Sequence, residues 1–138
     1  MSDPTVSPSS PAGVHRRVVD AYADVLAGNL DEALTLIAPD VIDHRGGADG
    51  DHIGRDAWQE KWEQAAQQFG GVTVTVEHNV SAGDTSANRY RMRGMDPASG
   101  RSYEVTGLDM VRVRNGQIVE HWALLDQAAL AAQLGLDG

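Results

Sequence analysis

Two ionisable residues, Asp109 and His121, each lie within an otherwise apolar run near the C-terminal end of the chain. The runs are separated by Asn115-Gly116, a pair typical of tight β-hairpin turns. A carboxylate beside an imidazole at low dielectric can transfer protons. The same two residues can also form a buried pair with only a structural role. The turn decides whether they meet.

Two turns are compatible with this hairpin. A two-residue turn would pair Asp109 with Trp122 and send His121 to the other face, whereas a three-residue turn over 114–116 pairs Asp109 directly with His121. The alternation of apolar residues favours the three-residue turn. It gathers on one face Val105, Gly107, Asp109, Val111, Val113, Val119, His121, Ala123 and Leu125. We therefore predict that Asp109 and His121 meet on an apolar sheet face.

The rest of the chain must position this hairpin. Apolar residues at helical spacing predict helices over 14–27, 32–37 and 55–69, and a short strand over 41–44. Alternating segments predict strands over 72–80 and 87–94, and Asp126 is placed to cap a last helix over 127–134. This order predicts one α+β domain over residues 14–138, after a disordered Ser/Pro-rich arm over 1–13. A curved, mostly antiparallel sheet covered by helices on one face encloses a conical cavity, where we expect a small ligand.

Composition excludes several classes of function. The net charge is −9, and Lys61 is the single lysine, so no basic surface favours nucleic acid or an anionic membrane. There is no cysteine, which excludes disulfides and thiolate chemistry. The N-terminus resembles no signal segment and no apolar run reaches membrane length, so we expect a cytoplasmic protein.

Other side chains are candidates for the cavity. Tyr22, on the apolar face of the first helix, is either a core tyrosine or a hydrogen-bond donor to a ligand. His44 is a candidate catalytic residue, and its neighbour Asp43 a candidate pocket residue. We expect the remaining lining to comprise Trp58, Trp62, Tyr90, Met92, Gly107 and Ala123. A metal site of His44, Asp109 and His121 is a weaker alternative, because nothing besides residue type supports it.

The chain resembles the SnoaL-like polyketide cyclases of the nuclear transport factor 2-like superfamily. The resemblance runs from about residue 15 to 135, and is clearest in 39–44, 109–112, 115–122 and 133–135. It implies a conical fold, a homodimer, no metal or cofactor, and acid–base chemistry on a small hydrophobic substrate. The acid/base aspartate of the family's aldol cyclases falls on Ala123, and two of their pocket residues fall on Gly107 and Asp109. The resemblance therefore implies the fold without that acid/base.

Ketosteroid isomerases, which share the superfamily, offer a second comparison. They polarise a carbonyl with a tyrosine and a neutral aspartic acid, which are similar in position to Tyr22 and Asp109. That aspartic acid is a known example of a carboxylic acid that stays neutral and donates a hydrogen bond. Their catalytic base falls near residues 43–45.

These observations predict a cofactor-independent isomerase, cyclase or dehydratase that acts on a hydrophobic, carbonyl-bearing, polyketide-like substrate. Asp109 and His121 would handle the proton, with assistance from Tyr22 and His44. One alternative is epoxide opening, which would need an arginine such as Arg45 or Arg91 in the cavity. The other is a binding module without catalysis. The outward residues Leu108, Met110, Trp122 and Leu124 form an apolar patch through which we expect a homodimer.

Overall fold

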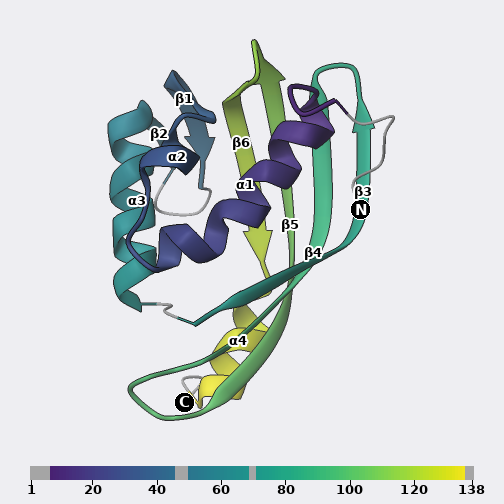
Figure 1. The fold of residues 1–138 in the computed structure, drawn as a ribbon. Coiled ribbons are helices and arrows are strands. Elements are labelled where there is room, and N and C mark those ends of the chain that lie inside the picture. Colours follow the sequence, from purple (N-terminus) through teal and green to yellow (C-terminus); the bar gives the residue numbers. More distant parts are fainter. Residues whose placement is uncertain (1–6, 46–49, 69–70, 136–138) are drawn as a thin grey trace.

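The computed structural model describes residues 7–45, 50–68 and 71–135. Helices α1, α2 and α3 lie on one face of a curved sheet, and α4 lies near the far end of the long β4–β5 hairpin (Figure 1). The elements are α1 (Pro11–Leu26), α2 (Asp31–Leu34), β1 (Ile37–His44), β2 (Asp51–Ile53), α3 (Arg55–Gln68), β3 (Thr73–Ala82), β4 (Thr85–Met95), β5 (Ser102–Arg114), β6 (Gln117–Leu125) and α4 (Gln127–Leu134).

The six strands form one sheet in the order β2-β1-β6-β5-β4-β3. All neighbours pair antiparallel except β1 and β6, which are parallel. This arrangement confirms the α+β class and the curved, mostly antiparallel sheet. The parallel pair has a direct consequence for the site, because it places the end of β1 beside the centre of β6.

The turn of the β5–β6 hairpin differs from our prediction. Asn115 and Gly116 both have positive φ, 53° and 74°, and Arg114 pairs with Gln117, so the turn has two residues. This is the geometry for which an Asn-Gly pair is suited. The predicted three-residue turn and the predicted direct pairing of Asp109 with His121 were both wrong.

A β-bulge nevertheless restores the predicted face. The register shifts between Arg112 and Val113, so that His121 pairs with Val111, and Asp109 pairs with Ala123. One extra residue in β6 moves every later side chain of that strand to the opposite face. Asp109 and His121 are therefore diagonal neighbours on the inner face.

Because of the bulge, two apolar side chains near the turn differ in burial from what we expected. Ile118 pairs with Val113 and is 1% exposed, whereas Val119, which we expected on the inner face, is only partly buried. The amide of Ile118 donates to the carbonyl of Leu36, which precedes β1. Contacts with β1 thus accompany the shifted register of β6.

The N-terminal elements also differ in their bounds. Helix α1 begins at Pro11 after Ser10, whose hydroxyl accepts a hydrogen bond from the amide of Gly13. The expected disordered arm over 1–13 therefore overlaps the helix, and its residues 1–6 lie outside the described residues.

The second helix is shorter than we expected. It ends at Leu34, because the chain pairs with β6 from Ile37 onward. Pro39 therefore lies within β1, in the irregular stretch between Ile37 and Ile42, where no regular ladder hydrogen bond is required of it. The final helix matches the prediction, with Asp126 as its N-cap and Gly135 left-handed after it.

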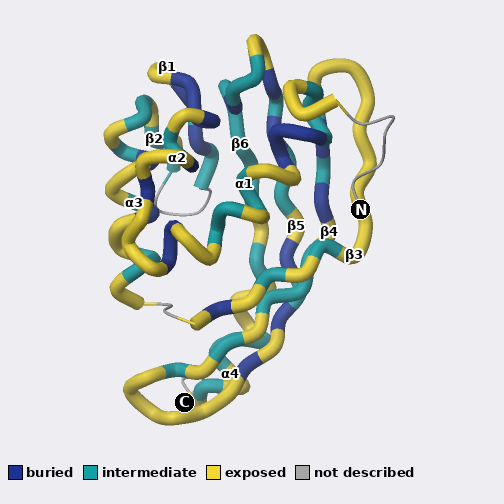
Figure 2. Tube along the Cα trace, in the orientation of Figure 1, coloured by how far each residue is buried: buried dark blue, intermediate teal, exposed yellow. Residues whose placement is uncertain are grey.

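The main hydrophobic core lies between the helices and the inner face of the sheet, and buried segments of these layers face one another (Figure 2). Its buried members are Val14, Val25, Leu30, Ala33, Leu36, Ile37, Val41, Trp58, Trp62, Val111, Val113 and Ile118. Polar residues buried beside this core, His15 and Asp43 among them, mark the candidate site.

Candidate active site

The parallel pairing of β1 with β6 places Asp43 directly beside His121 on the inner face. Nδ1 of His121 lies 2.9 Å from Oδ1 of Asp43, whose side chain is 3% exposed. The carboxylate therefore fixes the orientation of the imidazole ring.

The other nitrogen of His121 faces a second carboxylate. Nε2 lies 3.4 Å from Oδ2 of Asp109, one strand away on β5. His121 is thus held between two aspartates, one at each ring nitrogen.

Two cations compensate the charge of Asp43. Oδ2 of Asp43 accepts hydrogen bonds from Nζ of Lys61 at 2.8 Å and from Nε of Arg45 at 3.0 Å. Burial alone would raise the pKa of Asp43, but hydrogen bonds from His121 and Lys61, together with the charge of Lys61, hold it well below its usual range. Asp43 is therefore an ionised acceptor at neutral pH.

Asp109 is also ionised. Burial opposes its charge, but the close approach of His121 and a hydrogen bond from His15 lower the pKa of Asp109 to about 2. The neutral aspartic acid implied by the resemblance to ketosteroid isomerases is therefore not what this environment favours. Here the carboxylate accepts hydrogen bonds instead of donating one.

A cavity of about 230 Å³ opens between α1, α3 and the inner face of the sheet. Its lining is largely apolar, and its polar groups are Tyr22, Lys61, Tyr90, Asp109 and His121. The apolar lining residues are Val18, Val19, Trp62, Ala65, Val74 and Ala123. A mostly apolar cavity with a few convergent polar groups is typical of a small-molecule site.

The two tyrosines remain protonated across the physiological range. Burial raises the pKa of Tyr22, and burial with the nearby charge of Asp109 raises the pKa of Tyr90 to about 12. Within ranges 7–45, 50–68 and 71–135, neither hydroxyl forms a hydrogen bond to another protein group, so both can donate to a ligand.

Lys61 has a second contact besides Asp43. Its Nζ lies 3.4 Å from the centre of the Trp58 ring, a cation–π contact. Burial lowers the pKa of Lys61, and the charge of Asp43 opposes that effect. The ammonium group thus supplies positive charge at the cavity wall.

His44, which we expected in the catalytic set, lies on the opposite face of the sheet. It pairs with Trp122, and the two rings stack at 5.1 Å. Its nitrogens lie 2.7 Å from Asp51 and 2.7 Å from Glu120. Successive residues of a strand point to opposite faces, so Asp43 faces inward and His44 outward. This excludes His44 both as a cavity residue and as a partner of Asp109 and His121 in a metal site.

Four other expected lining residues lie near the cavity without lining it. Trp58 packs edge-on against His121 at 5.0 Å, and Asp43 lies behind that imidazole. Met92 packs against a second apolar cluster around Leu26, Val72 and Tyr103.

Gly107 is the fourth of these residues, and Tyr90 covers it. A Cβ at Gly107 would overlap the Tyr90 ring, so glycine permits this close approach.

Two polar residues of the site, His15 and Lys61, were not among those predicted from the sequence. His15 is 1% exposed, and its Nε2 lies 3.0 Å from Oδ2 of Asp109. Helical spacing could have identified it, because His15 is seven residues before Tyr22 and so shares its face of α1. Lys61 similarly lies three residues after Trp58 on the inward face of α3.

Neither arginine considered for epoxide opening lines the cavity. Arg45 bonds to Asp43 and to the carbonyl of Ala57, behind the site. Arg91 pairs with Glu77 and Glu104 outside it.

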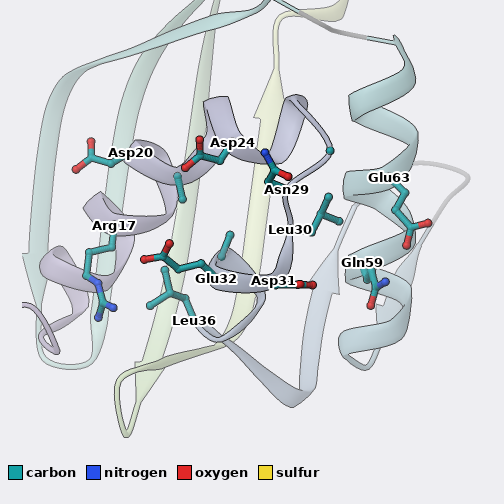
Figure 3. A pocket seen from close by; sticks show the side chains of 13 residues that line it. Arg17, Asp20, Asp24, Asn29, Leu30, Asp31, Glu32, Leu36, Gln59 and Glu63 are labelled. Carbon is teal, nitrogen blue, oxygen red and sulfur yellow. The ribbon is translucent and has the colours of Figure 1, made fainter.

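A larger hollow of about 840 Å³ lies elsewhere, between α1, α2 and α3 (Figure 3). It is open and mostly acidic, with Asp20, Asp24, Asp31, Glu32 and Glu63 at its edges. Its chemistry is unrelated to that of the conical cavity. In the part of the chain that the structure describes, no three or more His, Asp or Glu side chains are grouped so as to hold a metal ion. No helix in that part is long and apolar enough to span a bilayer.

The fold and this inward-facing site define a nuclear transport factor 2-like protein, and comparison with known families identifies its subgroup. The family model of SnoaL-like polyketide cyclases matches residues 16–134, so the chain belongs to that family. No curated protein matches the sequence significantly.

Solved structures agree with this assignment. Wild-type IdmH from Streptomyces antibioticus, described as a candidate polyketide cyclase, is 34% identical, with a TM-score of 0.75 over 91% of this chain and 98% of that one. A loop-truncation variant of IdmH is 36% identical, with a TM-score of 0.78 over 91% of this chain and 100% of the variant. A candidate SnoaL-like polyketide cyclase from Shewanella putrefaciens shares the fold at 18% identity, with a TM-score of 0.76 over 99% of each chain.

Proposed function

We propose that this protein is a cofactor-independent acid–base enzyme of the cyclase or isomerase type, acting on a small, hydrophobic, carbonyl-bearing substrate in the conical cavity. The observation that carries the proposal is the position of His121 between Asp43 and Asp109 at the cavity wall. Membership of the SnoaL-like family, and the similarity of this chain to a candidate polyketide cyclase, support a polyketide-like substrate.

His121 is the proton acceptor in this proposal. Its Nδ1–H donates to ionised Asp43, which leaves the lone pair of Nε2 available as a base. Nε2 takes the proton from a carbon next to the carbonyl, and the electron pair of the C–H bond becomes that of an enolate. The imidazolium formed lies between two carboxylates, which stabilises it.

The hydroxyls of Tyr22 and Tyr90 are the donors for the enolate oxygen. Both line the cavity, and their raised pKa values keep them protonated. The ammonium of Lys61 adds positive charge at the same wall. Such preorganised donors commonly provide a large part of the stabilisation of a developing oxyanion.

The enolate then has two outcomes. Its carbon attacks a second carbonyl carbon of the same substrate, which closes a ring while the carbonyl oxygen takes the electron pair of the C=O π bond and the proton from Nε2 of His121. Alternatively, where a neighbouring C=C bond extends the enolate, its far carbon takes the proton from Nε2, which isomerises the substrate. In neither outcome is an external oxidant or reductant needed.

A binding module without catalysis is the second candidate. It is favoured by Ala123, which cannot donate or accept a proton at the position of the family's aldol-cyclase aspartate. In that case the cavity binds the same kind of ligand, but His121 and Asp109 have no effect on its conversion.

Binding of 2-naphthol tests the cavity. This planar phenol resembles a bound enolate, and we expect it to perturb the NMR signals of Tyr22, Tyr90 and His121. Ala123→Leu should fill the cavity and weaken binding at least tenfold, whereas Leu124→Ala, on the outer face, should leave it unchanged. Equal binding by both variants would contradict the assignment of the site.

A further inference from the structure

His15 is a second buried histidine beside the candidate site, and the function proposed above assigns it no role. Its Nε2 lies 3.0 Å from Oδ2 of Asp109, the oxygen that also faces His121, while Oδ1 of Asp109 is buried without a partner among the described residues. Oδ2 of Asp109 therefore lies close to two histidines, His15 on α1 and His121 on β6.

The far nitrogens of the two rings have different partners. Nδ1 of His15 lies 2.8 Å from Oγ of Ser86, whereas Nδ1 of His121 lies 2.9 Å from Oδ1 of Asp43. A carboxylate only accepts hydrogen bonds, but a hydroxyl can also donate one. The partner at the far nitrogen fixes the tautomer of a histidine.

The direction of the hydrogen bond between Ser86 and His15 follows from Asp109. Because the ionised carboxylate only accepts, Nε2 of His15 carries the proton, and Nδ1 of a neutral His15 accepts from the hydroxyl of Ser86. Nδ2 of Asn79 has three acceptors within reach, Oδ1 of Asn88 at 2.6 Å, Oγ of Ser86 at 2.9 Å and the carbonyl of Ala87 at 3.2 Å. Its donation to Oγ leaves the hydroxyl proton of Ser86 available for Nδ1 of His15.

We propose that His15 and His121 are held as opposite tautomers on Asp109, and that His15 is a positioning residue while His121 carries the proton. The chain of donors runs from Asn79 through Ser86 and His15 to Asp109. His15 has its proton on Nε2 and donates it to Asp109, and its Nδ1 is already occupied by the Ser86 proton, so it has no free lone pair. His121 has its proton on Nδ1 and keeps a free lone pair on Nε2. The role of His121 rests on the proposed function, but the tautomers do not.

The charged and titratable groups around Asp109 come from several elements. Lys61 on α3 and Tyr22 on α1 line the same cavity, as do His121 and Tyr90, and Asp43 lies beyond His121. His15 is buried and does not line the cavity, so it contacts Asp109 from behind. Its donation holds the carboxylate ionised and in place.

Nitrogen NMR of the full chain, labelled with ¹⁵N in histidine, tests the tautomers near neutral pH. Signals are assigned from His15→Gln, His121→Gln and the exposed His78→Gln. We expect His15 to have a protonated Nε2 and an unprotonated Nδ1, and His121 the reverse. The same tautomer in both rings, or a His15 that is protonated on both nitrogens, would overturn the proposal without any bearing on turnover.

The positioning role is tested by titrating the side-chain carboxyl carbon of Asp109. His15→Leu, which removes the donor but keeps an apolar side chain, should raise the pKa of Asp109 by about one to two pH units. His15→Gln keeps an amide donor and should restore most of the wild-type value, and His78→Gln should leave it unchanged. An unaltered Asp109 titration in folded His15→Leu would contradict the role.

The α-proton exchange of 2-tetralone in D₂O separates this inference from the proposed function. If His15 positions Asp109, His15→Leu lowers the exchange rate, and His15→Gln, which keeps a donor to Asp109, restores most of it. Equal losses of rate in His15→Leu and His15→Gln show a structural role only and overturn the inference while the function stands. Absence of exchange in the wild type, with opposite tautomers observed, overturns the function while the inference stands.

Discussion

His121 and Asp43 are 78 positions apart in the sequence but lie side by side on parallel strands. Nδ1 of the imidazole is 2.9 Å from the carboxylate. This contact fixes the ring so that its other nitrogen faces Asp109 and the cavity. Asp43 therefore orients His121, the candidate base. The carboxylate of Asp109 faces the nitrogen on which His121 takes up the proton.

Loss of Asp109 or of His121 should reduce catalysis without unfolding the protein. We expect Asp109→Asn and His121→Gln each to lower kcat/KM by about 10²–10⁴-fold, the range typical of general acid–base catalysis. Because the two residues act together, the double variant should be little worse than either single variant. Kinetics on the true substrate, with circular dichroism as the control for folding, measure this, and additive losses would argue against a coupled pair.

Acid should destabilise the fold through its ionised aspartates. The pKa of Asp109 is lowered to about 2 in the folded protein, so the carboxylate contributes stability above its ordinary pKa and loses it as the pH falls from about 4 to about 2. The lowered pKa of Asp43 adds to this effect in the same direction. Asp109 alone accounts for a loss on the order of 2 kcal/mol.

Urea unfolding followed by tryptophan fluorescence at a series of pH values measures this loss. In Asp109→Asn the free energy of unfolding should fall less steeply with acid than in the wild type. Parallel pH dependence in the two proteins would show that Asp109 has an ordinary pKa.

His44 should affect stability but not the cavity. Hydrogen bonds to Glu120 and Asp51 raise its pKa in the folded protein, so its contribution is present at low pH and is lost as the pH rises through the raised value. We expect His44→Gln to reduce the free energy of unfolding more at pH 6 than at pH 9. Binding of 2-naphthol should be unchanged, and weakened binding would return His44 to the site.

The close approach of Tyr90 to Gly107 should be visible in a double-mutant cycle. Gly107→Ala overlaps the Tyr90 ring, and overpacking of this kind typically costs about 1–3 kcal/mol. In the background of Tyr90→Ala the same change should cost much less, because the ring is absent. An equal cost in both backgrounds, measured by urea unfolding, would locate the strain elsewhere.

The outer face of the sheet should form a homodimer. Leu108 is 52% exposed and Leu124 73% exposed, and they border an apolar hollow that also includes Met110 and Trp122. Light scattering should give twice the chain mass at micromolar concentration. Leu124→Glu should yield monomers, whereas Met95→Glu, exposed at the end of β4, should not. A monomeric wild type would contradict the prediction.

The sequence predicted the fold, the hairpin and the shared face of Asp109 and His121, because all three depend on local alternation and turn residues. It predicted the face from the wrong turn, since the β-bulge in β6 accompanies contacts with β1 that local patterns do not encode. The parallel pairing of β1 with β6 also turns Asp43, and not His44, toward His121. No local sequence pattern distinguishes these two neighbours.

His15 lay within reach of sequence analysis, because it shares the inward face of α1 with Tyr22. Its role did not, because Ser86 and Asp109 come to it from strands that are 71 and 94 positions away. Contacts across such distances depend on the register of the whole sheet.

The most direct test of the central claim is the exchange of α-protons of 2-tetralone, a small hydrophobic ketone, followed in D₂O by NMR. If His121 is a general base in the cavity, the wild-type protein accelerates the exchange, with or without EDTA. His121→Gln then reduces the acceleration at least a hundredfold, as does Asp109→Asn, and His78→Gln leaves it intact. Equal exchange rates in wild type and in His121→Gln would contradict the account.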